Sequence, residues 1–193
     1  MRRNIGMQPS RLQKKLPEDL YARLRTRLGT LGDVRSPDQA ESPILHPSVR
    51  QAIFQWMAEI RSIDELSAVG VRPRTNALLF GPPGCGKTTM AHHFAARLGL
   101  PLVIVGSENI IGKYLGESGS NIARLFEAIK EEDTQVVLFM DEFEAVGMSR
   151  SALGGGQCDN EKSAALTVLL RKIEEFRSGY FMAATNIPDS IDP

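Results

Sequence analysis

The octapeptide Gly81–Thr88, which reads GPPGCGKT, constrains the fold of this chain more than any other feature of its sequence. It fits the pattern G-x-x-x-x-G-K-[ST] at every fixed position, after an apolar run that ends at Phe80 and before an amphipathic segment. Glycines let the backbone of such a loop curl so that its N–H groups face phosphate oxygens at the positive end of the next helix. The pattern therefore predicts a strand, a phosphate-binding loop and a helix in succession. The alternative is a glycine-rich turn with only a structural role.

The same loop carries side chains suited to a nucleotide and its metal ion. We expect Lys87 to neutralise charge on the β- and γ-phosphates and Thr88 to offer its hydroxyl to Mg²⁺. A thiol stands at Cys85, and we expect its alkylation to block ATP binding. The predicted nucleotide-binding residues are Gly81, Pro82, Pro83, Gly84, Cys85, Gly86, Lys87, Thr88 and Thr89.

Short apolar runs alternate with amphipathic segments around this loop. Runs that are apolar throughout and separated by helices are typical of a parallel sheet covered on both faces. The sequence therefore predicts an α/β fold, a three-layer sandwich, with another helix after Pro47. The predicted strands are 77–80, 102–105, 136–140 and 180–184, and the predicted helices lie near 87–98, 121–132 and 161–177.

Composition excludes several other classes of protein. Of the 193 residues, 42% are hydrophobic and 24% are charged, which is typical of a soluble domain with a core. Apolar runs such as Val136–Met140 are far shorter than the roughly 18–20 residues that span a bilayer. Two cysteines, Cys85 and Cys158, make no disulfide framework, so we expect a reducing, cytoplasmic setting.

The first 35 residues differ from the rest of the chain. Residues 1–50 carry ten lysines and arginines against five acids, although the net charge of the whole chain is zero. We predict a separate basic amphipathic helical segment over 1–35, which docks on its own domain or on a neighbouring subunit. Nucleic-acid binding is a weaker alternative, because no aromatic residues are interleaved with the charges. Leucines recur at helical spacing at Leu12, Leu16, Leu20, Leu24 and Leu28.

Two acids follow the apolar run Val137–Met140. At the tip of a strand, Asp141 can hold Mg²⁺ through its water shell, beside the hydroxyl of Thr88. The next residue, Glu142, can polarise the water that attacks the γ-phosphate. The alternative is a helix N-terminus enriched in acids, but the phosphate loop upstream favours the catalytic interpretation.

Three segments together resemble the Walker A, Walker B and sensor 1 motifs of AAA+ ATPases, specifically the AAA subgroup. They are Gly81–Thr88, Val137–Glu142 and Ala184–Asn186, and the resemblance extends over roughly residues 40–193. It implies a P-loop NTPase fold, with residues 36–193 as the ATPase core. It also implies that Asn186 helps to position the attacking water, so the predicted catalytic residues are Glu142, Asn186 and Lys87.

The resemblance further implies a ring, expected to be a hexamer, that uses Mg-ATP to remodel or translocate a polypeptide. Residues Tyr114, Leu115 and Gly116 are similar to the first pore loop, in which an aromatic and an aliphatic side chain grip the polypeptide. The glycine-rich segment Met148–Asn160 stands in the place of the second pore loop, and a surface loop is the alternative there. No His-Glu-x-x-His zinc-protease motif occurs, and His92-His93 is interpreted as a solvated or packed pair.

The chain stops at Pro193, before the segment that carries arginine fingers, the last core strand and the helical lid in AAA proteins. An arginine finger can contribute 10³–10⁵ in rate. We therefore expect a fragment of a longer protein, weakly active or inactive by itself. Two alternatives to an active ATPase remain open, namely a non-hydrolysing switch or assembly module and a nucleic-acid remodeller.

Overall fold

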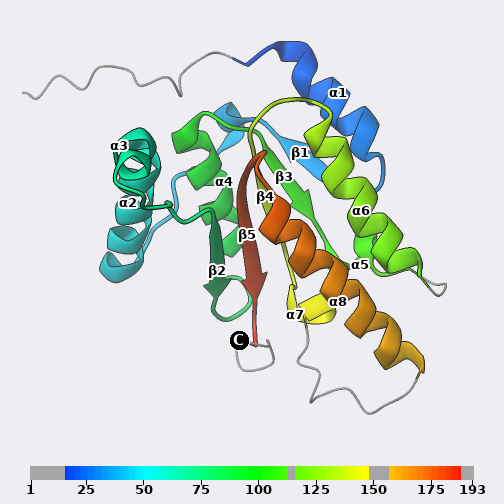
Figure 1. Ribbon diagram of the computed structural model, residues 1–193. Coiled ribbons are helices and arrows are strands. Elements are labelled where there is room, and N and C mark those ends of the chain that lie inside the picture. Colours follow the sequence, from blue (N-terminus) through cyan, green and yellow to red (C-terminus); the bar gives the residue numbers. More distant parts are fainter. Residues whose placement is uncertain (1–15, 113–115, 148–156, 188–193) are drawn as a thin grey trace, which may run out of the picture.

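A computed structural model describes residues 16–112, 116–147 and 157–187, and a five-stranded sheet forms its centre (Figure 1). The strand order is β1-β3-β4-β5-β2; β3, β4, β5 and β2 run parallel to their neighbours, and β1 pairs antiparallel with β3. The strands are β1 (Asp33–Arg35), β2 (Asn76–Phe80), β3 (Leu102–Val105), β4 (Val136–Met140) and β5 (Gly179–Thr185).

Helices cover both faces of this sheet, which completes the predicted three-layer α/β sandwich (Figure 1). On one face α6 packs along α8, and on the other α4 contacts β3, β4 and β5. The helices are α1 (Glu18–Leu28), η2 (Pro37–Gln39), α2 (Pro47–Arg61), α3 (Ile63–Ala68), α4 (Lys87–Leu98), α5 (Ser107–Ile110), α6 (Glu117–Lys130), α7 (Glu144–Gly147) and α8 (Gln157–Glu175).

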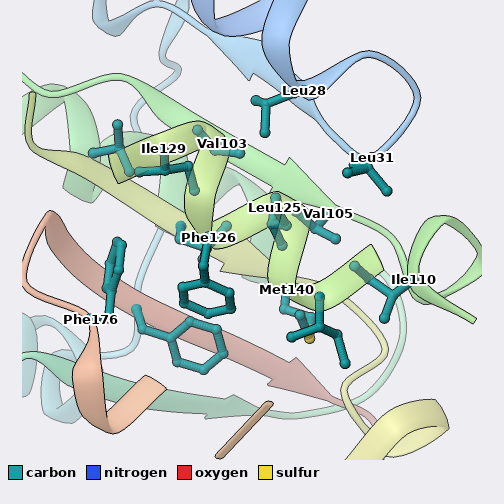
Figure 2. Packing of buried hydrophobic residues seen from close by; sticks show 14 of the residues in the cluster. Leu28, Leu31, Val103, Val105, Ile110, Leu125, Phe126, Ile129, Met140 and Phe176 are labelled. Carbon is teal, nitrogen blue, oxygen red and sulfur yellow. The ribbon is translucent and has the colours of Figure 1, made fainter. Parts of the chain in front are cut away.

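Two hydrophobic clusters, one on each face, hold the layers together. The central strands β4 and β5 are buried along their whole length, as expected for parallel strands between two helical layers. On the α6 and α8 face, Phe126 and Phe176 meet edge to face with ring centroids 5.5 Å apart (Figure 2). On the opposite face, Trp56 of α2 stacks on Phe94 of α4 at 4.3 Å.

All four predicted strands are confirmed, and so are the helix after Pro47 and the three helices further along the chain, with different ends for two of those three. α6 begins at Glu117, four residues before the prediction, because its first turn is polar and therefore showed no apolar periodicity. Gly116 precedes it in the left-handed conformation, with φ 80°, where glycine is favoured. α8 begins at Gln157, so the end of the segment 148–160 is helical.

Strand β1 was not predicted from the sequence. It has three residues, and only Val34 among them is buried, so it is too short to show strand alternation. It extends the sheet beyond β3.

Helix α1 docks on its own chain, one of the two placements that the leucine pattern left open. Leu20, Leu24 and Leu28 are buried in the same cluster as α6 and the sheet. Arg23 and Arg27 of α1 both form ion pairs with Glu132, just beyond α6. Leu12 lies outside the described residues, and the division of the chain at residue 35 stays a prediction.

Candidate nucleotide-binding site

The three motifs meet at the carboxyl ends of adjacent strands. In the order β4-β5-β2, β5 lies between the strand that precedes the acids and the strand that precedes the phosphate loop. Lys87 Nζ donates a hydrogen bond to Asn186 Oδ1 at 2.7 Å. Thr88 Oγ1 donates to Asp141 Oδ2 at 3.2 Å. Residues 99 and 53 positions apart in sequence therefore form one polar site, as expected at the carboxyl edge of an open α/β sheet.

The phosphate loop has the backbone that its glycines predict. Gly84 and Gly86 adopt φ of 75° and 86°, a region that other residues rarely occupy. Apart from the glycine and its two chain neighbours, nothing lies within 4 Å of where a Cβ would stand on either residue, so the loop is open at both positions. Lys87 Nζ also donates to the carbonyl oxygens of Gly81 at 2.8 Å and Pro82 at 3.1 Å. The loop thus holds an ammonium group over its own backbone at the N-terminus of α4.

The two acids after β4 have different surroundings. The backbone N–H of Asp141 donates to Val105 of β3 at 3.0 Å, and its Oδ1 accepts from the backbone N–H of Glu142 at 2.9 Å. Glu142 is exposed and has φ of 50°, a costly conformation for a residue with a Cβ. Strained backbone of this kind concentrates at functional sites. The strand tip thus presents the Glu142 carboxylate outward beside Asp141.

Sequence reasoning missed Ser107, which contacts this acid. Ser107 is the buried first residue of α5, and its hydroxyl donates to Glu142 Oε2 at 3.2 Å. The sequence signal was its position just after β3, since β3 and β4 are neighbours and end at the same edge. A cavity of 340 Å³ opens beside these groups, with Glu108, Asp141 and Glu142 among its lining residues.

Sequence reasoning also missed Glu144, the first residue of α7. Its Oε1 accepts from the backbone N–H of Asn186 at 3.3 Å. Burial raises the pKa of the Glu144 carboxyl. Hydrogen bonds from its own backbone, Thr185 and Asn186, together with the charge of Lys87, lower the pKa by more than burial raises it. The net pKa lies below the ordinary value, so this carboxylate is charged at neutral pH.

The donor set fits a magnesium nucleotide. Thr88 and Asp141 bring a hydroxyl and a carboxylate oxygen to one point, and Mg²⁺ prefers oxygen ligands. Among the described residues no group of three or more His, Cys, Asp or Glu could hold a metal ion. Proteins commonly hold Mg²⁺ by one or two side-chain oxygens, with substrate phosphates and water as the other ligands, and Thr88 and Asp141 would offer such a pair.

Other predicted residues lie elsewhere or outside the described part. Tyr114 and Leu115 are outside the described residues, and Gly116 is at the start of α6. Of the predicted second pore loop, 148–156 is also outside them. His92 is packed rather than solvated, being 5% exposed with Nε2 2.8 Å from the carbonyl oxygen of Ser36. Across 16–112, 116–147 and 157–187, no helix has the length and apolarity needed to cross a membrane.

Comparison with known proteins agrees with the resemblance of the three motifs to AAA ATPases. Residues 77–193 match the model of the ATPase family associated with various cellular activities (AAA). The uncharacterized AAA family ATPase y4kL of Sinorhizobium fredii is 41% identical over 143 residues, 74% of this chain and 42% of that protein. The 26S proteasome subunit RPT4 of Saccharomyces cerevisiae is 35% identical over 152 residues, 73% of this chain and 34% of that protein.

A third relative is the ATP-dependent zinc metalloprotease FtsH of Halothermothrix orenii, 32% identical over 152 residues, 77% of this chain and 24% of that protein. The chain thus spans less than half the length of each of these three relatives. The family match covers more than half of the chain and includes the whole polar site. This chain belongs to the AAA family of ATPases.

Proposed function

We propose that this chain binds Mg-ATP at the carboxyl edge of its sheet and hydrolyses the γ-phosphate. The observation that carries the proposal is the pair of contacts from the phosphate loop, Lys87 to Asn186 and Thr88 to Asp141. They bring a phosphate-binding cation, a metal-binding pair and a polar amide within one site. Phosphoryl transfer depends on positioning and electrostatic stabilisation, which these groups can supply.

Each residue has a proposed role that follows from its chemistry. Lys87 neutralises charge on the β- and γ-phosphates, and Thr88 with Asp141 would hold Mg²⁺. When bound there, the metal ion would supply positive charge that offsets the charge developing on the phosphates. Glu142 accepts a proton from the attacking water, and Ser107 orients its carboxylate.

Asn186 is proposed to position the attacking water. Its Oδ1 accepts from Lys87, which leaves its Nδ2 as a donor toward the water or the γ-phosphate. One side chain thereby connects the phosphate-binding cation to the reacting groups.

The second part of the proposal concerns the work to which ATP hydrolysis is coupled. We propose that copies of the chain assemble into a ring, a hexamer, in the cytoplasm and act on a polypeptide. Support comes from the likeness of Tyr114–Gly116 to a pore loop and from two relatives named as a zinc metalloprotease and a proteasome subunit. The proposal concerns only the region of these relatives that aligns with this chain.

The test separates binding from hydrolysis. Affinity is measured with a fluorescent ATP analogue in Mg²⁺, and turnover by phosphate release, for the wild type and variants. Lys87→Ala should weaken nucleotide binding at least about tenfold, because it removes the phosphate-binding cation. Glu142→Gln should bind as the wild type does but lose about 10²–10⁴-fold in turnover, the usual contribution of a general base.

A matched control is Glu108→Gln, since Glu108 is an exposed carboxylate that lines the same cavity. It should keep the wild-type turnover. Wild-type binding without turnover would instead identify the non-hydrolysing switch. Wild-type affinity in Lys87→Ala would contradict the proposed nucleotide site.

A further inference from the structure

Glu144 holds the turn that carries Asn186. Its Oε1 accepts from the backbone N–H of Asn186 at 3.3 Å, across 42 residues of sequence. Thr185 also lies close enough to Glu144 for its hydroxyl to lower the pKa of that carboxyl. That hydroxyl accepts in turn from the backbone N–H of Ile187 at 3.0 Å. The backbone N–H groups of the two residues just after β5, Asn186 and Ile187, are therefore both held by side chains, those of Glu144 and Thr185.

The segment around Glu144 is itself fixed to β5. The backbone N–H of Phe143 donates to the carbonyl oxygen of Ala184 at 2.8 Å. Phe143 is 6% exposed and Thr185 is fully buried, so neither can shift without disturbing packing. The start of α7 and the end of β5 thus form one rigid junction, with the Glu144 carboxylate inside it.

One oxygen of this carboxylate is unusual for a structural group. Glu144 Oε2 is buried and has no hydrogen-bond partner among the described residues. A buried polar atom without a partner costs free energy, and such atoms in native proteins call for an explanation. An acidic residue that only stabilised the start of α7 could keep its carboxylate in water. The free-energy cost of burying Glu144 Oε2 therefore suggests that this carboxylate has a role at the nucleotide site.

We propose that Glu144 is a positioning residue for ATP hydrolysis, which holds the backbone of Asn186 so that its side chain stays directed at Lys87 and the γ-phosphate. The inference rests on the proposed function. In this proposal Glu144 acts on hydrolysis through its contact with Asn186. Loss of its acceptor lets the turn relax, and a misplacement of about 1 Å can cost on the order of 10²-fold in rate.

The test compares three variants in the full chain. Glu144→Leu removes both oxygens, whereas Glu144→Gln keeps an oxygen that can accept from Asn186. Glu144→Leu should lower kcat by about 10- to 100-fold, with ATP affinity within about twofold of the wild type. Glu144→Gln should recover most of that loss. Thr185→Val removes the linking hydroxyl at nearly constant volume, and it serves as a second variant if Glu144→Leu fails to fold.

A double-mutant cycle with Asn186→Ala shows whether the two residues act together. If Glu144 acts through Asn186, Glu144→Leu should lower kcat less than about twofold further in that background. Independent, multiplying losses would overturn the proposal. So would a loss of ATP affinity as large as the loss of kcat.

Amide hydrogen exchange gives a readout that needs no turnover. Exchange at the Asn186 and Ile187 N–H groups should accelerate at least about tenfold in Glu144→Leu, while exchange in β4 stays unchanged. Unchanged exchange at both amides would overturn the proposal. If the wild type hydrolyses no ATP, the proposed function fails and the role in hydrolysis fails with it, but the exchange data still decide whether Glu144 holds the turn.

Discussion

At the residue scale, the site depends on side chains that the phosphate loop holds near Asp141, which follows β4, and Asn186, which follows β5. Lys87 is bonded to two loop carbonyls and to Asn186, so its ammonium group is held before any phosphate binds. Preorganised charge of this kind is the most effective form of electrostatic stabilisation. Of the two residues missed from the sequence, Ser107 contacts Glu142 and Glu144 contacts the backbone of Asn186.

Cys85 provides a chemical test of the loop. Its side chain is exposed, and its Sγ lies 3.9 Å from Lys87 Nζ. An alkyl adduct would add bulk to the phosphate loop beside Lys87, so modification should weaken Mg-ATP binding at least about tenfold. The measurement is nucleotide affinity before and after complete reaction with N-ethylmaleimide.

The experiment uses a Cys158→Ser background, so that Cys85 is the reactive thiol. Cys85→Ser in the same background is the matched control, and the reagent should leave its affinity unchanged. Full modification of Cys85 with unaltered affinity would contradict the placement of the nucleotide on this loop.

At the scale of elements, long and strongly patterned segments were predictable and short ones were not. The strand–loop–helix order around Gly81–Thr88 follows from local chemistry, and apolar runs identify β3, β4 and β5. The three residues of β1 become a strand only because β3 offers a free edge, which is a tertiary effect. The link from Glu144 to Asn186 depends on the order of strands, which no local pattern reveals.

The junction of α1 with α6 is where electrostatics affects stability. The side chain of Glu132 is 3% exposed, while its partners Arg23 and Arg27 are 47% and 42% exposed. Burial raises the pKa of Glu132, but hydrogen bonds from both guanidinium groups outweigh it and hold the pKa below the ordinary value. A carboxyl whose pKa is lowered by folding stabilises the protein when it is ionised.

Glu132→Gln should therefore lower the free energy of unfolding at pH 7 by about 1 kcal/mol, since both guanidinium partners are half in water. The stabilisation is complete above the unfolded pKa, about 4.3 for glutamate, and is lost as the pH falls through the lower folded pKa. The difference in the free energy of unfolding between wild type and variant should shrink as the pH falls from the unfolded pKa to the folded pKa. Urea unfolding at pH 7, 4 and 3 measures it, and a difference that grows toward low pH would contradict the ion-pair account.

At the scale of the whole molecule, the fold is that of an AAA ATPase. Family membership follows from the match over residues 77–193. The ring, the polypeptide substrate and hydrolysis itself are proposals about this chain. Assembly bears on hydrolysis because the resemblance implies that a neighbouring subunit contributes to the transition state.

The most direct test of this account is Mg-ATP turnover per chain over a wide range of protein concentrations, with Glu142→Gln measured beside the wild type. The account predicts that turnover per chain rises with concentration as copies assemble. It also predicts that turnover stays at background in Glu142→Gln at every concentration. Equal turnover in both proteins, or background turnover in both at every concentration, would contradict the central claim that this site hydrolyses ATP.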